Sequence, residues 1–201
     1  MTEQKRKLNL AAILVAAGPS SRLGQAKQLV KYEGETLARR SASLLVELDL
    51  HPVVVTGCGA EKVAAEMKGL PVKTVLNPEW EKGMGGSIAY GARFVPQLPD
   101  GILVMVCDQW QLCQDDLKKL VAAWTSEPSQ VHVANWQEGA AYVSGPPVIF
   151  PGKLHGELKG LEKSRGARQV IDRYIDIVKF IELQSAARDL DRPEDLEELL
   201  S

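Results

Sequence analysis

Charged residues cluster shortly after the first apolar segment of this chain of 201 residues. The sequence AAGPSSRLGQAK, which contains Gly18, Arg22 and Lys27, directly follows the apolar run 10–16. Small residues let a backbone approach a ligand and direct its N–H groups outward. Arg binds phosphate oxygens through two parallel hydrogen bonds, and Lys adds a compact positive charge. The pattern favours a phosphate-binding loop, although an ordinary Gly/Ser loop with two solvated cations fits the same residues.

Two better-known phosphate-binding motifs do not fit this loop. A P-loop requires G-x-x-x-x-G-K-[ST], but here Gly18 and Gly24 enclose five residues and Gln25 follows. The dinucleotide fingerprint G-x-G-x-x-G is broken by Pro19 and Ser20. The segment is therefore neither a Walker loop nor a dinucleotide-binding turn.

The elements that must position this loop alternate between strand and helix. Apolar runs predict strands at 10–16, 52–56, 72–76, 102–107, 131–134, 148–150 and 177–183. Helical spacing predicts helices at 36–48, 61–68, 86–94, 114–124, 167–174 and 193–200. Such alternation implies right-handed βαβ units and a mostly parallel sheet, with ligands beyond the carboxyl ends of the strands. The loops after Ala16, Leu76 and Cys107 leave that edge, and the less regular last third is compatible with an antiparallel strand.

Composition and charge exclude several classes of protein. With 24 Lys and Arg against 26 Asp and Glu, the net charge is -2, so there is no broad positive field for nucleic acid or anionic lipid. The hydrophobic share of 45% and the charged share of 25% are typical of a globular chain. The length fits one domain, which we expect over residues 8–201, with residues 1–7 disordered.

The N-terminal segment and the cysteines indicate the compartment. We interpret the apolar run 10–17 as a first buried strand and not as a signal peptide, because it ends in a Gly-rich polar loop that continues into a well-patterned chain. No segment approaches the roughly 20 apolar residues of a membrane span. The three cysteines form no C-x-x-C pair and the three histidines are scattered, which argues against a zinc site or a disulfide framework. We therefore expect a cytoplasmic protein.

Five motifs taken together resemble a known family. The loop reads as A-A-G-x-S-x-R-L-G-x-x-K after an opening strand, which resembles nucleotidyltransferases with a glycosyltransferase A-type fold. It is most similar to the MocA-like molybdenum cofactor cytidylyltransferases, neighbours of the MobA guanylyltransferases. The other four matches are NPEWEKGMGGSI at 77–88, Asp108-Gln109 in place of D-Q-P, GPPVIF at 145–150 and DLDRPED at 189–195. They keep their order from residue 11 to residue 200.

The resemblance implies a fold, a reaction and a set of site residues. The fold is α/β, a three-layer α/β/α Rossmann-like nucleotidyltransferase fold with a mostly parallel sheet. The reaction is Mg²⁺-dependent transfer of CMP from CTP to molybdopterin with release of pyrophosphate. Nucleotide binding is implied for Ala16, Ala17, Gly18, Arg22, Lys27, Gly83 and Ser87. A catalytic role is implied for Arg22, Lys27 and Asp108, and acceptor binding for Gly145, Pro147 and Arg168.

Two aspartates are the expected Mg²⁺ ligands, because Mg²⁺ takes one or two carboxylates plus phosphate oxygens. Asp108 directly follows the apolar run 102–107, where a strand-end turn or helix cap would explain it equally well. The resemblance implies Asp191 as the second ligand. Asp191 also precedes Pro193 and Glu194 in an ordinary helix-start pattern, so an N-cap role fits it too.

Departures from the family pattern leave the acceptor open. Trp110 replaces the proline of D-Q-P and, of the four tryptophans, is the best candidate for a stacking platform beside Asp108, whereas the others read as packing groups. Close relatives read G-D-x-G-A-R where this chain has KSRGAR, so Ser164 replaces the acidic residue. A sugar phosphate or methylerythritol phosphate is an alternative acceptor. A further alternative is a non-catalytic helper that delivers the cofactor to a molybdoenzyme.

The choice of nucleotide depends on a single methyl group. Ala17 occupies a position where the guanylyl group tends to have a second glycine, so its methyl near the base favours a pyrimidine. A contact of that size gives only about 1–3 kcal/mol of discrimination. CTP is the expected nucleotide on this ground.

Overall fold

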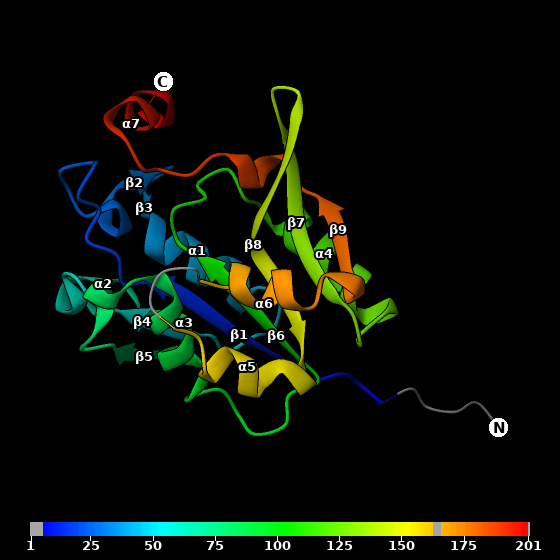
Figure 1. Ribbon diagram of the computed structural model, residues 1–201. Helices are drawn as coiled ribbons and strands as arrows, with labels where there is room; N and C mark the ends of the chain where they lie inside the picture. Colours follow the sequence, from blue (N-terminus) through cyan, green and yellow to red (C-terminus); the bar gives the residue numbers. More distant parts are fainter. Residues whose placement is uncertain (1–5, 163–165, 201) are drawn as a thin grey trace.

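The computed structural model describes residues 6–162 and 166–200, and helices cover both faces of its central sheet (Figure 1). The sheet has seven strands in the order β5-β4-β1-β6-β8-β7-β9. These strands are β1 (Leu10–Ala16), β4 (Val53–Thr56), β5 (Lys73–Leu76), β6 (Gly101–Val106), β7 (Val131–Glu138), β8 (Ala141–Pro151) and β9 (Val178–Glu182). A small hairpin of β2 (Lys31–Tyr32) and β3 (Glu35–Thr36) lies outside it.

The direction of the strands confirms the mostly parallel sheet. β1 runs parallel to both β4 and β6, and β4 runs parallel to β5. β8 runs antiparallel to β6 and β7, while β9 is again parallel to β7. The antiparallel strand thus falls in the less regular last third, where the sequence left room for one.

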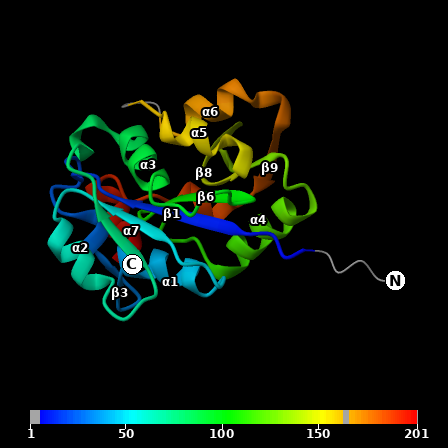
Figure 2. The same cartoon turned by 90° about the horizontal axis from the view of Figure 1, so that it is seen from below.

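Two helical layers sandwich the sheet, as expected for the three-layer α/β/α fold (Figure 2). One layer consists of α3 (Met84–Ala92), α5 (His155–Lys159) and α6 (Arg168–Arg173), whose buried residues share one core cluster. The other consists of α1 (Leu37–Val46), α2 (Ala60–Glu66) and α4 (Gln114–Ser126), which share the second cluster. Because both faces are covered, β1 and β6 are continuous apolar runs without polar alternation.

The last helix, α7 (Pro193–Leu200), lies beside the β2–β3 hairpin (Figure 1). Its Leu199 joins a small third core cluster with Leu23, Leu37 and Trp110. Short 3-10 turns complete the chain at Lys27–Leu29, Trp80–Lys82, Gly152–Leu154, Ile175–Ile177 and Gln184–Ala187.

The strands β7 and β8 are longer than the sequence analysis predicted. β7 and β8 extend beyond the predicted ends at 134 and 148 and pair as far as Glu138 and Ala141, forming an arm that stands out beyond the sheet in Figure 1. The arm sequence mixes polar, small and aromatic residues, so it lacks the continuous apolar run on which the prediction depended. The short helix α5 was also not predicted.

The carboxyl ends of four neighbouring strands lie level. Ala16 pairs with Thr56 and Thr56 with Leu76, while Val15 pairs with Val106. The loops after β1, β5 and β6 therefore leave one edge, as predicted, and they form the candidate site.

The N-terminal residues contact the opposite edge. Arg6 forms an ion pair with Asp100, and the Lys7 ammonium lies 3.3 Å from a carboxylate oxygen of Asp49. The predicted disorder of 1–7 falls mainly on residues 1–5, which lie outside the described residues. Among the helices described, none combines the length and hydropathy that crossing a membrane requires.

Candidate active site

A pocket of about 430 Å³ opens at the carboxyl edge of β1 and β6. The loop after β1, the segment that enters α3 and the residues that follow β6 form its walls. Seven of the predicted residues line it, namely Ala16, Ala17, Gly18, Lys27, Gly83, Ser87 and Asp108. The structure therefore brings together residues that are up to 92 positions apart in the sequence.

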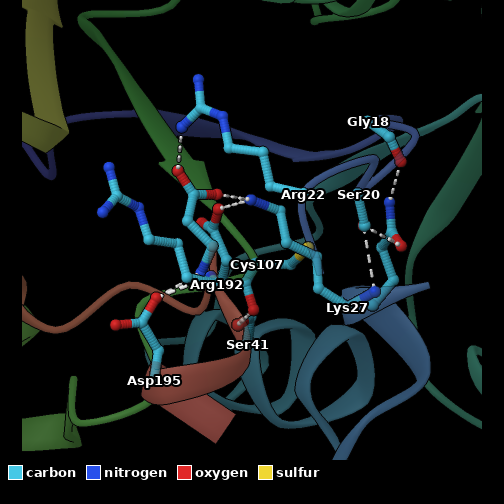
Figure 3. A network of polar contacts seen from close by, with 11 residues as sticks. Gly18, Ser20, Arg22, Lys27, Ser41, Cys107, Arg192 and Asp195 are labelled. Atoms are coloured by element: carbon cyan, nitrogen blue, oxygen red, sulfur yellow. Dashed lines mark hydrogen bonds and ion pairs between the residues drawn. The ribbon is translucent and has the colours of Figure 1, made fainter. Parts of the chain in front are cut away.

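The loop after β1 is held closed by a glutamine that the sequence analysis did not identify. Gln28 is 1% exposed, and its amide nitrogen donates to the carbonyl of Gly18 at 2.6 Å. The backbone N–H of Lys27 donates to the hydroxyl of Ser20 at 3.0 Å, and Figure 3 shows Gly18, Ser20 and Lys27 linked in this way. The loop shape is thus fixed from within, because its buried polar groups satisfy one another.

Lys27 lies between two carboxylates at the centre of the site. Its Nζ is 2.5 Å from Oδ2 of Asp108 and 2.6 Å from Oδ1 of Asp191. The side chains of Lys27 and Asp108 are only 15% and 11% exposed. Arg22 approaches the other oxygen of Asp191 at 3.3 Å but is largely exposed, and Figure 3 shows it beside Lys27. The four charged residues predicted to bind phosphates or a metal therefore meet in one cluster.

The cluster determines the protonation of its members. Burial opposes the charge on Lys27, but the carboxylates of Asp108 and Asp191 outweigh it and raise the pKa of Lys27 well above its ordinary value. Burial likewise opposes ionisation of Asp191, but Lys27 and then Arg22 outweigh it and lower the pKa of Asp191. Burial, followed by repulsion from Asp108 and Asp191, raises the pKa of Asp189. A charged lysine between two carboxylates is the resulting state at neutral pH.

Asp191 reaches the cluster because the chain returns from the far side of the sheet to the end of β6. The N–H of Leu190 donates to the carbonyl of Asp108 at 3.0 Å, and Gln109 and Asp189 form an isolated antiparallel bridge. The carboxylate of Asp195 accepts from the N–H groups of Asp191 and Arg192 at 2.9 and 2.7 Å. Since Asp195 serves the N-terminus of α7, the Asp191 carboxylate is available to the site.

Gln109 links this segment to the predicted acceptor strand. Its side chain is 5% exposed, and its amide nitrogen donates to the carbonyls of Pro146 and Ala186 at 2.7 and 2.8 Å. One side chain therefore ties the end of β6 to β8 and to the segment that leads to Asp191. The sequence analysis quoted Gln109 as part of a motif but assigned it no role, because both of its partners are distant in sequence.

The two carboxylates fit a divalent cation. Oδ1 of Asp108 is buried without a hydrogen-bond partner among the described residues, so it has an unused acceptor position. Its other oxygen already shares a single cationic nitrogen with Asp191. Within residues 6–162 and 166–200, no group of three or more His, Cys, Asp or Glu side chains is arranged to hold a metal. A pair of carboxylates completed by phosphate oxygens is the arrangement that suits Mg²⁺.

The segment 77–88 supplies the other wall of the pocket. Gly83 precedes α3 with φ +105°, a conformation that favours glycine. Ser87 is buried in the first turns of α3, and its hydroxyl accepts from the side-chain amide of Asn77 at 3.2 Å. The Asn77 oxygen in turn accepts from the N–H of Glu79 at 3.0 Å. Ser87 thus lies in the pocket wall one turn inside the helix and is not its N-cap.

Trp80 and Trp110 have the reverse of their expected roles, whereas Trp124 is a core residue as expected. Trp80 lines the pocket, and its approach requires Gly57, because a Cβ there would lie 2.6 Å from the Cβ of Trp80. Trp110 is buried in the third core cluster, with its ring edge-on to Tyr32 at 5.1 Å. The candidate stacking platform is therefore Trp80, and Trp110 is a packing group.

The predicted acceptor residues lie next to one another on β8 and α6 but do not line the pocket at the end of β1 and β6. Arg168 donates to the hydroxyl of Ser144 at 3.2 Å, beside Gly145 and close to the buried Pro147. Its Nε also contacts Asp172 at 2.8 Å within α6. The departure at Lys163, Ser164 and Arg165 lies outside the described residues.

Known proteins with similar sequences span most of this chain. Purine catabolism protein PucB of Bacillus subtilis is 30% identical over 172 residues, which cover 81% of this chain and 80% of that protein. Nicotine blue oxidoreductase of Paenarthrobacter nicotinovorans is 27% identical over 205 residues, which cover 95% of this chain and 96% of that protein.

Solved structures show the same fold. Rv0371c from Mycobacterium tuberculosis superimposes with a TM-score of 0.79 at 24% identity, over 96% of this chain and 97% of that one. A second structure of Rv0371c is a complex with manganese, with a TM-score of 0.74 at 21% identity over 96% and 98% of the two chains.

The sequence model described as a MobA-like NTP transferase domain matches residues 12–178. That range contains the loop after β1, the segment 77–88 and Asp108, which are the parts of the pocket described above. The family indicated by the motifs is therefore confirmed, and the chain is a nucleotidyltransferase that belongs to the MobA-like NTP transferase family.

Proposed function

We propose that this protein transfers CMP from CTP to molybdopterin and releases pyrophosphate. The observation that carries the proposal is the cluster at the end of β6, in which Lys27 contacts both Asp108 and Asp191 beside a pocket for a nucleotide. Cations for phosphates and carboxylates for a metal occur there within hydrogen-bond distance of one another. Nucleotidyl transfer needs this combination, because a triphosphate must be neutralised and aligned with its acceptor.

The loop after β1 orients the nucleotide in this proposal. The backbone of Ala16, Ala17 and Gly18 faces the base and ribose, since these residues line the pocket. Lys27 and Arg22 bind the phosphates, and their charges stabilise the negative charge that develops on the leaving pyrophosphate. Lys27 supplies a fixed charge from a nearly buried position, whereas the exposed Arg22 closes over the phosphates from the rim.

The transfer itself is a single displacement. A phosphate oxygen of the acceptor forms a bond to the α-phosphorus while the bond between that phosphorus and the bridging oxygen breaks, so pyrophosphate leaves. The chain's part is to hold the two phosphates in line, which requires no covalent enzyme intermediate. Asp108 and Asp191 would hold Mg²⁺, which supplies Lewis-acid stabilisation of the phosphate oxygens when bound. The manganese complex of Rv0371c supports a divalent cation in this fold.

CTP is the proposed nucleotide on the basis of Ala17. This residue is buried in the pocket wall, so its methyl group narrows the space for a base where a glycine would leave it open. Trp80 lines the same pocket and offers an aromatic surface for stacking. The Ala17 methyl group favours a small base, whereas the Trp80 surface can stack on any base, and neither reads its hydrogen-bonding edge.

The acceptor is proposed to bind along β8 and α6. Gly145 and Pro147 provide the strand, and Arg168 provides a cation for an anionic group. A sugar phosphate would use the same cation, so the acceptor must be identified by testing molybdopterin, sugar phosphates and methylerythritol phosphate side by side. If pyrophosphate forms with molybdopterin and with no other acceptor, the proposal is supported. If it forms with another acceptor instead, that compound replaces molybdopterin as the proposed acceptor.

The nucleotide-binding part is tested by thermal shift with Mg²⁺ and each of CTP, GTP, ATP and UTP. Ligand at about 100 times its Kd adds roughly 2.7 kcal/mol of stability. We expect the largest shift with CTP and none with Asp108→Ala. NADH and NADPH belong in the panel because one relative is named an oxidoreductase. We expect no shift with either, since the loop lacks the dinucleotide fingerprint.

A helper that only binds and delivers the finished cofactor gives a different pattern. It predicts tight binding of the nucleotide-bearing cofactor, capture of a molybdoenzyme in a pull-down and no pyrophosphate from CTP and molybdopterin. Binding of CTP without turnover in the presence of molybdopterin would favour that function over ours.

A further inference from the structure

The contact between Lys27 and the two carboxylates also bears on how a metal would bind. We propose that Lys27 is a placeholder cation, which occupies the metal position until the phosphates of a nucleotide draw it away. Metal and nucleotide would then bind tightly only together. This inference rests on the proposed function, because it assumes that Asp108 and Asp191 are the metal ligands.

The lysine and a metal that used the same two carboxylate oxygens would exclude each other. The ammonium nitrogen lies 2.5 Å from one carboxylate oxygen and 2.6 Å from the other. Mg²⁺ binds carboxylate oxygens at about 2.1 Å, so an ion that bridges the same two oxygens would occupy nearly the same point. Two cations cannot share this point, because their charges repel and their volumes overlap.

Displacing the lysine without offering it another partner is unfavourable. Lys27 is 15% exposed, so water reaches it poorly, and a buried ammonium without a counter-ion is strongly disfavoured. Arg22 adds positive charge at Asp191 from 3.3 Å, which further opposes a metal that arrives alone. The charges of the two carboxylates are therefore already neutralised by Lys27 and Arg22.

A nucleotide supplies the missing partner. Lys27 lines the pocket next to Gly18, so the phosphates of a bound nucleotide lie within reach of its ammonium. The backbone of Lys27 stays anchored to Ser20 at 3.0 Å, and the flexible four-carbon stem allows the ammonium to move alone. When the ammonium pairs with phosphate, both carboxylates become free for the metal.

This exchange couples the two ligands thermodynamically. Each ligand must raise the affinity for the other by the same factor. Part of that factor comes from direct contact between metal and phosphate, which does not involve Lys27. A variant without the ammonium separates the two contributions, because it removes only the exchange.

The test measures binding of Mn²⁺ alone by calorimetry or electron paramagnetic resonance, without nucleotide or acceptor. We expect Lys27→Met to bind Mn²⁺ at least ten-fold more tightly than the wild-type chain, since the carboxylates then have no cation between them. Lys31→Met, the same change at an exposed position on β2, should match the wild type. Equal or weaker Mn²⁺ binding by Lys27→Met overturns the placeholder role.

Lys27→Arg keeps the positive charge and serves as a control for effects of substitution at this position other than loss of charge. It should bind Mn²⁺ alone as weakly as the wild type, and thermal melts must show that all variants fold. Adding CTP should increase the Mn²⁺ affinity of the wild type by a larger factor than that of Lys27→Met. An equal factor in the two proteins contradicts the exchange.

The outcomes keep this inference separate from the proposed function. If GTP and not CTP produces the coupling, the choice of nucleotide is wrong but the placeholder stands. If Lys27→Met does not change Mn²⁺ binding while pyrophosphate forms normally in the wild type, the transferase function stands and the placeholder is wrong.

Discussion

The proposed nucleotide side and the proposed acceptor side of this site are built differently. The nucleotide side is made of parallel strand ends, a loop closed by the buried Gln28, and a lysine that is almost enclosed by its two carboxylates. The acceptor side consists of the antiparallel strand β8 and the half-exposed Arg168, whose contact across to that strand is a hydrogen bond to Ser144.

This difference indicates which part of the site is free to vary. Changing a buried, mutually satisfied network is costly, whereas an exposed contact can be replaced with little effect on folding. On the proposed function, substitutions on the acceptor side should therefore disturb the fold and the nucleotide side least. The following predictions test that division, from the largest expected effect to the smallest.

Replacing Asp108, the first of the two proposed metal ligands, should nearly abolish nucleotidyl transfer. Asp108→Asn removes the charge that would hold the metal but keeps the shape, so we expect pyrophosphate release to fall by at least about 10²–10³-fold. Asp115→Asn, at an exposed position on α4, serves as the matched control. A variant Asp108→Asn with more than a tenth of the wild-type rate would contradict the assignment.

Removing the buried cation, Lys27, should reduce turnover more than removing the exposed cation, Arg22. Lys27→Ala should lower turnover at saturating CTP by about 10²-fold, because a fixed charge is lost from a nearly enclosed position. Arg22→Ala should cost only about ten-fold, since Arg22 is 71% exposed and its charge is screened by water. Steady-state kinetics at saturating CTP measure both. Unchanged turnover of Lys27→Ala would refute the phosphate-binding assignment.

Gln109 joins the two sides, so its loss should affect both. Gln109→Leu leaves the carbonyls of Pro146 and Ala186 without their donor, and each unpaired buried group costs about 1–3 kcal/mol. Urea unfolding should show this loss in the free energy of unfolding. Gln184→Leu, which removes exposed contacts to the β7–β8 arm, should cost clearly less. Equal losses in the two variants would argue against a clamp at Gln109.

A substitution on the proposed acceptor side should weaken binding of the acceptor without changing the rate of transfer. Arg168→Ala should raise the KM for the acceptor about ten-fold while kcat and the Kd for CTP stay unchanged, because an anion contact distant from the reacting atoms contributes uniform binding. Arg173→Ala on the same helix is the control. A fall in kcat without a change in KM would place Arg168 in the transfer machinery instead.

The smallest effect concerns pH. Lys27 and Arg22 hold the pKa of Asp191 below its usual value, so its ionised form contributes stability above the unfolded-state pKa of about 3.9. That contribution is lost as pH falls through the lowered pKa of the folded state. The difference in urea midpoint between wild type and Asp191→Asn should therefore be present at pH 6 and shrink in strong acid. A difference that does not depend on pH would mean that the Asp191 charge contributes nothing.

Features of the site that depend on local sequence could be predicted, whereas contacts between distant segments could not. The bounds of β1 and the position of Asp108 follow from local signals, because a continuous apolar run defines a buried strand and the polar residue after it must lie at the sheet edge. Lys27 was assigned from its charge in the loop and from the motif, and Asp191 from the motif alone. Their contact depends on a chain reversal late in the sequence, which no local pattern specifies.

Other parts of the site could not be predicted. Gln28 and Gln109 are polar residues whose burial is explained only by carbonyls that the fold brings to them. Trp80 and Trp110 both lie at motif positions. Only the contact of Trp80 with Gly57 and the packing of Trp110 on Tyr32 distinguish the pocket wall from the core. The β7–β8 arm is held by pairing along a polar sequence, so apolar periodicity does not reveal it.

The most direct test of the central claim is to measure pyrophosphate release from CTP with Mg²⁺ and molybdopterin. Our account predicts stoichiometric formation of pyrophosphate and a CMP–molybdopterin product in the wild type, and neither in Asp108→Asn. Binding of CTP and molybdopterin by the wild type without any pyrophosphate would contradict it.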